Sequence, residues 1–151
     1  MDKPLILLGF DYGLKRIGIA VGQQLTGAAS GLTTIDARDG KPNWEAIRGL
    51  IGDWHPDALV VGIPSHMDGR PHELTKAAAR FARQLEGRFH LPVFRVDERL
   101  TSKAAETALG ERAGGYGRRQ VHDKAEIDKL AAQIILQSWL DSRDTAHDDG
   151  D

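Results

Sequence analysis

Short apolar segments recur along the chain and are separated by polar or helix-forming stretches. Such segments have the length and composition of strands that are buried on both faces of a sheet. The clearest ones are Leu5–Phe10, Ile17–Val21, Ala58–Ile63 and Leu91–Val96. A more polar segment, Gly31–Asp36, predicts one more strand after the second. The pattern therefore predicts a five-stranded sheet.

Three other segments carry apolar residues at helical spacing. The first is expected to begin after Asn43, a residue type common at N-caps, and to end at Trp54. The second covers Glu73–Arg88, and the third begins near Asp123 and ends near Ser142. A helix followed by a buried strand is typical of parallel crossover units. Because Gly13 permits a tight turn between the first two strands, that pair is expected to be antiparallel.

The remaining segments predict loops and ends. Asp36–Pro42 contains the residues typical of loops, and Thr101 is expected to cap a short helix that ends at Leu109. Four glycines between Gly110 and Gly117 predict a mobile segment. The acidic residues 143–151 predict a disordered tail, so we expect one domain over residues 1–142.

Composition narrows the class of protein. The chain has no cysteine, which excludes disulfides and thiolate chemistry. No signal peptide and no membrane-spanning run are expected, so we predict a cytoplasmic protein. The formal net charge is −2, with much of the acidic excess in the last residues. A protein that binds nucleic acid would therefore need a local basic patch.

Three acidic residues approach the predicted apolar layer. Asp11 lies at the inner end of the first strand, Glu98 follows the fifth strand, and Asp128 is beside the buried stripe of the last helix. Each has a simpler explanation: a turn cap for Asp11, a solvated strand end for Glu98, and a favourable helix dipole for Asp128. Together they suggest a site for Mg²⁺ or Mn²⁺, which prefer carboxylate oxygens. Zinc is disfavoured because the chain has no cysteine and its six histidines show no paired ligand spacing.

Four motifs in this order resemble the YqgF family of Holliday-junction-resolvase-like proteins and pre-16S rRNA nucleases. They are Asp11–Val21, Val61–Pro64 with Met67–Gly69, Asp97–Ser102 and Ile127–Ala132. The resemblance covers residues 5–140. It implies an RNase H-like α/β fold, with a five-stranded mixed sheet whose first three strands are antiparallel and with helices on both faces.

The resemblance also implies a cytoplasmic, metal-dependent nuclease that matures the 5′ end of 16S ribosomal RNA. By motif position, Asp11, Glu98 and Asp128 correspond to the catalytic and metal-binding acids. Arg16 and Arg99 correspond to partners of phosphate or carboxylate groups. The residues themselves leave two interpretations of Gly110–Arg119 open. It is either a flexible flap whose Arg112, Arg118 and Arg119 contact substrate phosphates, or an ordinary surface loop.

Other functions remain open at this point. Holliday junction resolution needs two sites on two strands and hence a dimer, whereas we expect a monomer or a weak homodimer. A nucleic-acid-binding module without catalysis is a further alternative. Sugar kinases and actin-like ATPases share the opening motif, but they need a second lobe that this chain is too short to form. The expected partner is nucleic acid, either precursor rRNA or branched DNA, and not a membrane.

Overall fold

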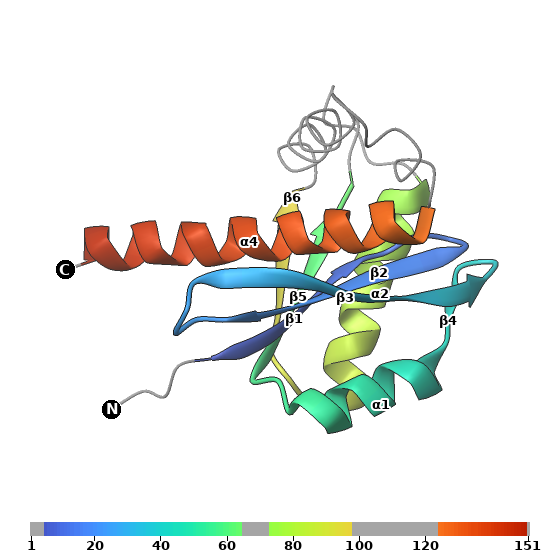
Figure 1. Cartoon of the computed structure of the whole chain (residues 1–151). Coiled ribbons are helices and arrows are strands. Elements are labelled where there is room, and N and C mark those ends of the chain that lie inside the picture. The colour runs from blue at the N-terminus through green and yellow to red at the C-terminus, as the bar shows by residue number, and fades with distance from the viewer. Residues whose placement is uncertain (1–4, 65–72, 98–123, 151) are drawn as a thin grey trace, which may run out of the picture.

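The computed structural model describes residues 5–64, 73–97 and 124–150. Within these ranges, six strands form one sheet in the order β4-β3-β2-β1-β5-β6 (Figure 1). The strands are β1 (Ile6–Asp11), β2 (Arg16–Gln23), β3 (Ala28–Arg38), β4 (Lys41–Pro42), β5 (Ala58–Ile63) and β6 (Val93–Asp97). Several predictions lie outside the described residues: Glu98, Arg99, the helix at 101–109 and the segment 110–119.

The sheet is mixed, as predicted. Neighbouring strands from β1 to β4 pair antiparallel, and the pairs β1–β5 and β5–β6 are parallel. The helices α1 (Trp44–Trp54) and α2 (Glu73–Phe89) form the connections that precede β5 and β6. The described part of the sheet has six strands where five were expected, because β4 adds a two-residue strand at one edge.

The turn between β3 and β4 explains that extra strand. Asp39 and Gly40 both adopt left-handed backbone conformations, with φ of 49° and 81°. An Asp-Gly pair suits the two-residue hairpin turn that needs positive φ at both positions. The predicted loop over Asp36–Pro42 is therefore wrong, because β3 continues to Arg38 and the chain reverses tightly into β4.

Predicted helix starts and ends agree with the structure for α1. The side chain of Asn43 accepts a hydrogen bond from the Ala46 backbone N–H at 3.2 Å, which makes it the N-cap. His55 ends the helix in a left-handed conformation, and its backbone N–H donates to the Ile51 carbonyl.

The last helix, α4 (Lys124–Gly150), is longer than expected. The predicted end near Ser142 is wrong, because the helix continues to Gly150. The prediction relied on apolar residues, which stop before the helix does. Residues 143–149 contain no glycine or proline, so nothing in the backbone breaks the helix there. The boundary of the functional domain at residue 142 stays a prediction.

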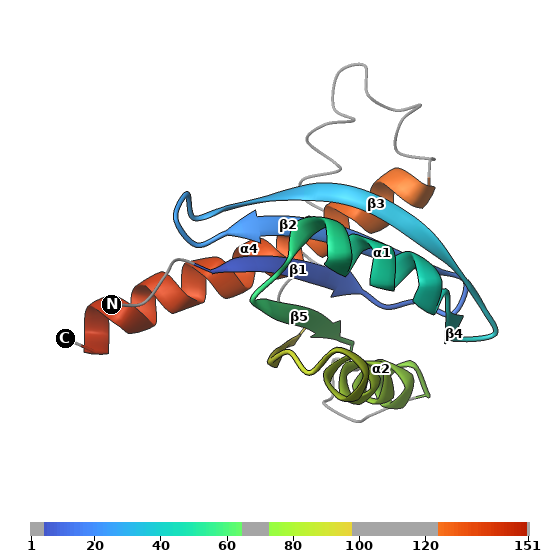
Figure 2. The same cartoon turned by 90° about the horizontal axis from the view of Figure 1, so that it is seen from below.

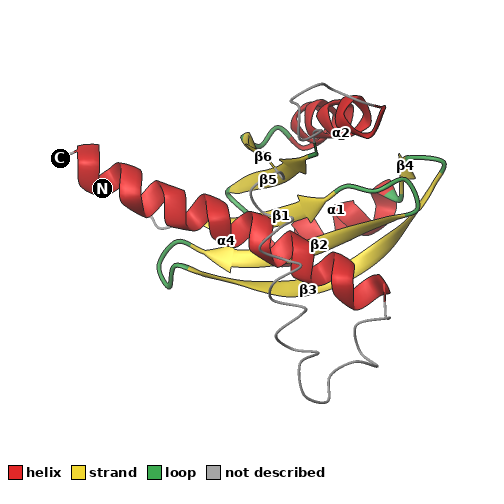
Figure 3. Ribbon diagram, turned by 90° about the horizontal axis from the view of Figure 1, so that it is seen from above, coloured by secondary structure: helices red, strands yellow, loops and turns green. Residues whose placement is uncertain are grey.

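Apolar side chains pack against both faces of the sheet. Figures 2 and 3 show α1 and α2 on one face and α4 across the other. On the first face, Phe10 of β1 and Phe81 of α2 meet edge to face with ring centroids 5.6 Å apart. On the second face, Leu7 of β1 belongs to one fully buried cluster with Leu136 of α4. No described helix has the length and apolar character that crossing a membrane requires.

Candidate active site

One row of residues crosses the sheet at the carboxyl end of β1. Pairing between the strands places them side by side in the order Thr34, Gly18, Asp11, Gly62 and Val96, from β3 to β6. Neighbouring strands lie about 4.8 Å apart. Asp11 is the acidic member of this row.

Asp11 faces α4. Side chains alternate along a strand, so Leu7, Gly9 and Asp11 share a face. Leu7 packs in the cluster that contains α4, and a Cβ atom at Gly9 would lie 2.8 Å from the Cβ of Leu136. The half-buried carboxylate of Asp11 therefore lies on the α4 side of the sheet, at its carboxyl edge.

The neighbours of Asp11 in the row are both glycines. Gly18 lies beside it on β2 and Gly62 lies beside it on β5. Neither carries a side chain, so no side chain from these two positions fills the space on either side of the Asp11 carboxylate. On the Gly18 side this space is taken by the backbone of α4 at Asp128.

Asp128 reaches the same place from α4. A Cβ atom at Gly18 would lie 2.0 Å from the Asp128 carbonyl oxygen and 3.0 Å from the Asp128 Cβ. The helix backbone thus packs directly on Gly18, one strand spacing from Asp11. Figures 1 and 3 show α4 running back across the sheet, with its first turns toward the carboxyl end of β1. The structure therefore brings the first turns of α4 and the end of β1 together.

Arg16 fixes the Asp128 carboxylate. Its Nε–H donates to Asp128 Oδ2 at 2.9 Å, and the two side chains are 33% and 21% exposed. An ion pair with this exposure contributes about 0.2–1 kcal/mol, so its role is mainly to orient the carboxylate. Of the two roles that the sequence left open for Arg16, contact with a carboxylate is the one observed. Contact with substrate phosphate stays a prediction.

A row of polar contacts positions α4 over the sheet. Gln137 accepts from the Ala29 backbone N–H at 2.9 Å and donates to the Gly27 carbonyl at 2.7 Å. Gln133 accepts from the Gly31 N–H at 3.1 Å. These bonds tie α4 to β3. The sequence analysis missed both glutamines, although their spacing of one helical turn places them on one face.

Thr34 adds a contact at the start of α4. Its hydroxyl donates to the Ala125 carbonyl at 2.8 Å. Thr34 belongs to the same row as Asp11, so this bond holds the first turn of α4 directly over the row. It thereby contributes to the placement of Asp128.

The donor chemistry of the pair suits a hard divalent cation. Asp11 and Asp128 offer carboxylate oxygens, the ligands that Mg²⁺ and Mn²⁺ prefer. Across residues 5–64, 73–97 and 124–150, no three acidic or histidine side chains are grouped as a metal site. The third predicted acid, Glu98, lies outside these ranges, and it follows directly after the last residue of β6 in sequence. Convergence of all three acids therefore stays a prediction.

Comparison with known families and curated proteins gives a consistent result. The RuvX family, described as Holliday junction resolvase, matches residues 5–142. A protein of Pseudomonas paraeruginosa named "Putative pre-16S rRNA nuclease" is 50% identical over 140 residues, which is 92% of this chain and 94% of that protein. A protein of Azotobacter vinelandii with the same name is 49% identical over 146 residues, covering 95% and 98% of the two chains.

Solved structures share the fold at low sequence identity. Thermus thermophilus RuvC in complex with a Holliday junction substrate superposes with a TM-score of 0.54 at 15% identity, covering 91% of this chain and 94% of that one. The fowlpox virus resolvase bound to Holliday junction DNA gives 0.53 at 12% identity, with coverage of 91% and 97%. These similarities support the RNase H-like arrangement of the sheet and helices.

Proposed function

The chain belongs to the RuvX (YqgF) family, and from that premise we propose that it is a nuclease that hydrolyses phosphodiester bonds at the 5′ end of precursor 16S ribosomal RNA. The observation that supports the proposal is the position of Gly18, which pairs with Asp11 in the sheet and lies directly against the Asp128 backbone of α4. Curated relatives at about half identity bear the name of this activity, which favours RNA over branched DNA as the substrate.

Asp11, Asp128 and Glu98 would hold Mg²⁺ or Mn²⁺ at the carboxyl edge of the sheet. Such an ion supplies a Lewis acid that activates water and stabilises the leaving oxygen of a phosphodiester. The protein's own part is positional. Gly18 lets α4 approach the sheet, and Arg16 orients the Asp128 carboxylate.

The substrate assignment is tested by a direct comparison of substrates. End-labelled RNA that carries the precursor 5′ leader and a labelled four-way DNA junction are incubated with the protein, with Mg²⁺, with Mn²⁺ or with EDTA. We expect specific cleavage of the RNA that needs the divalent ion, and no paired cleavage of the junction.

Two outcomes would contradict the proposal. Paired, symmetric cuts in the junction with intact RNA would assign the chain as a resolvase. Binding of RNA without cleavage under any metal condition would make it a nucleic-acid-binding module. In either case the assignment as a pre-16S rRNA nuclease would be withdrawn.

A further inference from the structure

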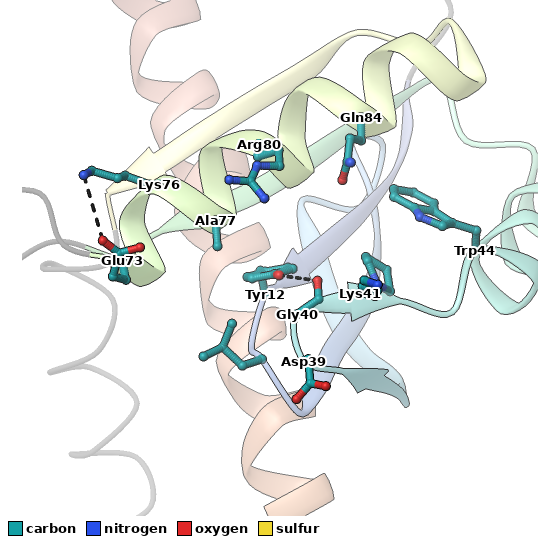
Figure 4. A pocket seen from close by; sticks show the side chains of 12 residues that line it. Tyr12, Asp39, Gly40, Lys41, Trp44, Glu73, Lys76, Ala77, Arg80 and Gln84 are labelled. Carbon is teal, nitrogen blue, oxygen red and sulfur yellow. Dashed lines mark hydrogen bonds and ion pairs between the residues drawn. The ribbon is translucent and has the colours of Figure 1, made fainter.

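A hollow lies at the same edge of the sheet as Asp11 but on the opposite face. It has a volume of about 770 Å³ and is formed by the end of β1, the β3–β4 turn, the start of α1 and one side of α2 from Glu73 to Gln84 (Figure 4). Tyr12 follows Asp11 directly, and alternation along the chain sends its side chain into this hollow while Asp11 faces α4. Cavities of this size hold small ligands or parts of larger ones.

The walls of the hollow are fixed by contacts within the protein. The Tyr12 hydroxyl donates to the Gly40 carbonyl, which ties the β3–β4 turn to the end of β1. Phe81 lies beneath both aromatic walls, with ring centroids 5.0 Å from Tyr12 and 5.7 Å from Trp44. The Arg88 guanidinium lies over the Trp44 ring at 4.1 Å. The hollow is therefore preformed, which lowers the entropic cost of binding.

The lining is mixed in charge, with a basic excess. Lys41, Lys76 and Arg80 line it, together with Asp39 and Glu73. Lys76 is engaged by Glu73 at 4.0 Å, whereas no ion pair to Lys41 or Arg80 occurs within the described part of the chain. Figure 4 shows Arg80 above Tyr12, between Lys76 and Gln84 along α2.

A smaller hollow of about 440 Å³ continues the basic path. It shares Lys41 and Pro42 with the first one and adds Arg38 and Asp36. Basic side chains therefore form a continuous row from the β3–β4 hairpin to α2. The phosphates of a nucleic-acid strand can bind along such a row.

We propose that this hollow holds a ribonucleotide of the RNA strand beside the bond that is cut. Lys41 and Arg80 would contact its phosphate, and Asp39 would accept hydrogen bonds from the 2′-hydroxyl or from base N–H groups. A simple inorganic anion would gain nothing from the acidic side chain. The identity of the ligand rests on the proposed function: an RNA strand cut beside Asp11 would have to cross the sheet edge at Tyr12 to reach the hollow.

The test measures binding of a fluorescein-labelled single-stranded RNA by anisotropy, in EDTA so that no cleavage occurs. The proteins are the wild type, Lys41→Ala, Arg80→Ala and a matched control, Arg83→Ala, which removes an exposed cation of α2 outside the hollow. Each affinity is measured between about 50 and 200 mM salt. We expect Lys41→Ala and Arg80→Ala to weaken binding about fivefold to tenfold, and each to reduce the slope of log affinity against log salt by about one. Arg83→Ala should leave both quantities near the wild-type values.

Equal affinities and slopes in all four proteins would overturn the inference. A second result would also overturn it: Arg80→Ala weakens binding of free adenosine 5′-monophosphate but leaves binding of the RNA unchanged. The hollow would then be a binding site for a free nucleotide. The cleavage assay separates this result from the proposed function. If the wild type cleaves RNA and the variants bind RNA as tightly as the wild type, only the role of the hollow is rejected. If the variants lose RNA binding and the wild type does not cleave RNA, only the nuclease assignment is rejected.

Discussion

Gly18 lies between the two described acids of the candidate site, beside Asp11 in the sheet and beneath Asp128 in the helix. Its role depends on the absence of a side chain. The 2.0 Å approach of the Asp128 carbonyl oxygen to a Cβ at this position is shorter than any real contact, and the atom in the way is backbone. Any side chain at position 18 therefore has to move α4 and the Asp128 carboxylate with it.

We expect Gly18→Ala to lower the free energy of unfolding by about 1–3 kcal/mol, the usual effect of overpacking. Because a shift of about 1 Å in a catalytic group slows a reaction about 100-fold, cleavage should fall by a similar factor. Urea unfolding and single-turnover cleavage measure the two effects.

Gly52→Ala is the matched control. Nothing lies within 4 Å of a Cβ at Gly52, which is exposed on α1. This change should stabilise the protein by about 0.5–1 kcal/mol and leave cleavage unchanged. If Gly18→Ala behaved like Gly52→Ala, the close packing of α4 on the sheet would not determine the site.

Tyr12 gives a prediction about pH. Burial raises the pKa of the Tyr12 phenol above its ordinary value of 10.0, and the nearby Arg80 lowers that pKa by a smaller amount. A raised pKa in the folded protein means that folding favours the protonated phenol. The resulting stability is complete below the unfolded pKa and is lost as the pH rises through the folded pKa.

Tyr12→Phe should therefore lower the free energy of unfolding by about 1 kcal/mol at neutral pH, because it removes the hydrogen bond to the Gly40 carbonyl. The difference from the wild type should shrink above pH 10.0, where the phenol begins to ionise in the unfolded wild type while it is still protonated in the folded protein. Denaturant unfolding of both proteins at neutral and alkaline pH measures this difference. A difference that stayed constant across the range would show that the ionisation of Tyr12 is not linked to folding.

At the scale of elements, the placement of α4 decides whether the acids meet. The helix packs on β1 through Leu136 and is tied to β3 through Gln133 and Gln137. The apolar contacts and the close packing on Gly9 and Gly18 hold the two layers together. The glutamines bond to particular backbone groups of β3, so they fix its position along the sheet.

We expect Gln137→Ala to lower the free energy of unfolding by about 1–3 kcal/mol, because two partly buried backbone groups lose their partner. Gln133→Ala removes one exposed bond and should have a smaller effect, about 0.5–1 kcal/mol. Urea unfolding of the two variants gives the comparison. Equal losses in both would mean that the two bonds of Gln137 stabilise the fold no more than the single exposed bond of Gln133.

For the molecule as a whole, the apolar pattern predicted the central elements well. The segment Ala58–Ile63 forms β5 as predicted, and α1 begins and ends where its cap and stop residues indicated. These elements are fixed by local signals and by burial on both faces. The β3–β4 hairpin was missed because its signal is the backbone conformation of two residues, Asp39 and Gly40, rather than a hydrophobic pattern.

The candidate site was predicted in part. The sequence singled out Asp11 and Asp128, and the strand register and the packing of Gly18 bring the segments that carry them together. It left the role of Arg16 open, because the choice between phosphate and carboxylate depends on where the helix lies. The glutamines and the hollow beside Tyr12 depend on contacts between distant segments, which a pattern along the chain does not reveal.

The central claim is that Asp11 belongs to a metal-dependent cutting site, and the cleavage rate of Asp11→Asn tests it most directly. Asn keeps the size of the side chain and removes the charge that attracts a divalent ion. The control is Asp53→Asn, which removes an exposed acid of α1. Single-turnover cleavage of labelled precursor RNA is measured in Mg²⁺, and thermal melting in metal-free buffer checks the fold.

The account predicts that Asp11→Asn melts at or above the wild-type midpoint, since close carboxylates repel one another without a cation. It should cut at least about 100-fold more slowly, because losing a metal ligand removes several kcal/mol of transition-state stabilisation. Asp53→Asn should cut at the wild-type rate. An Asp11→Asn protein that melts lower than the wild type and still cuts the RNA at the wild-type rate would contradict the account and leave Asp11 as a structural residue of the turn.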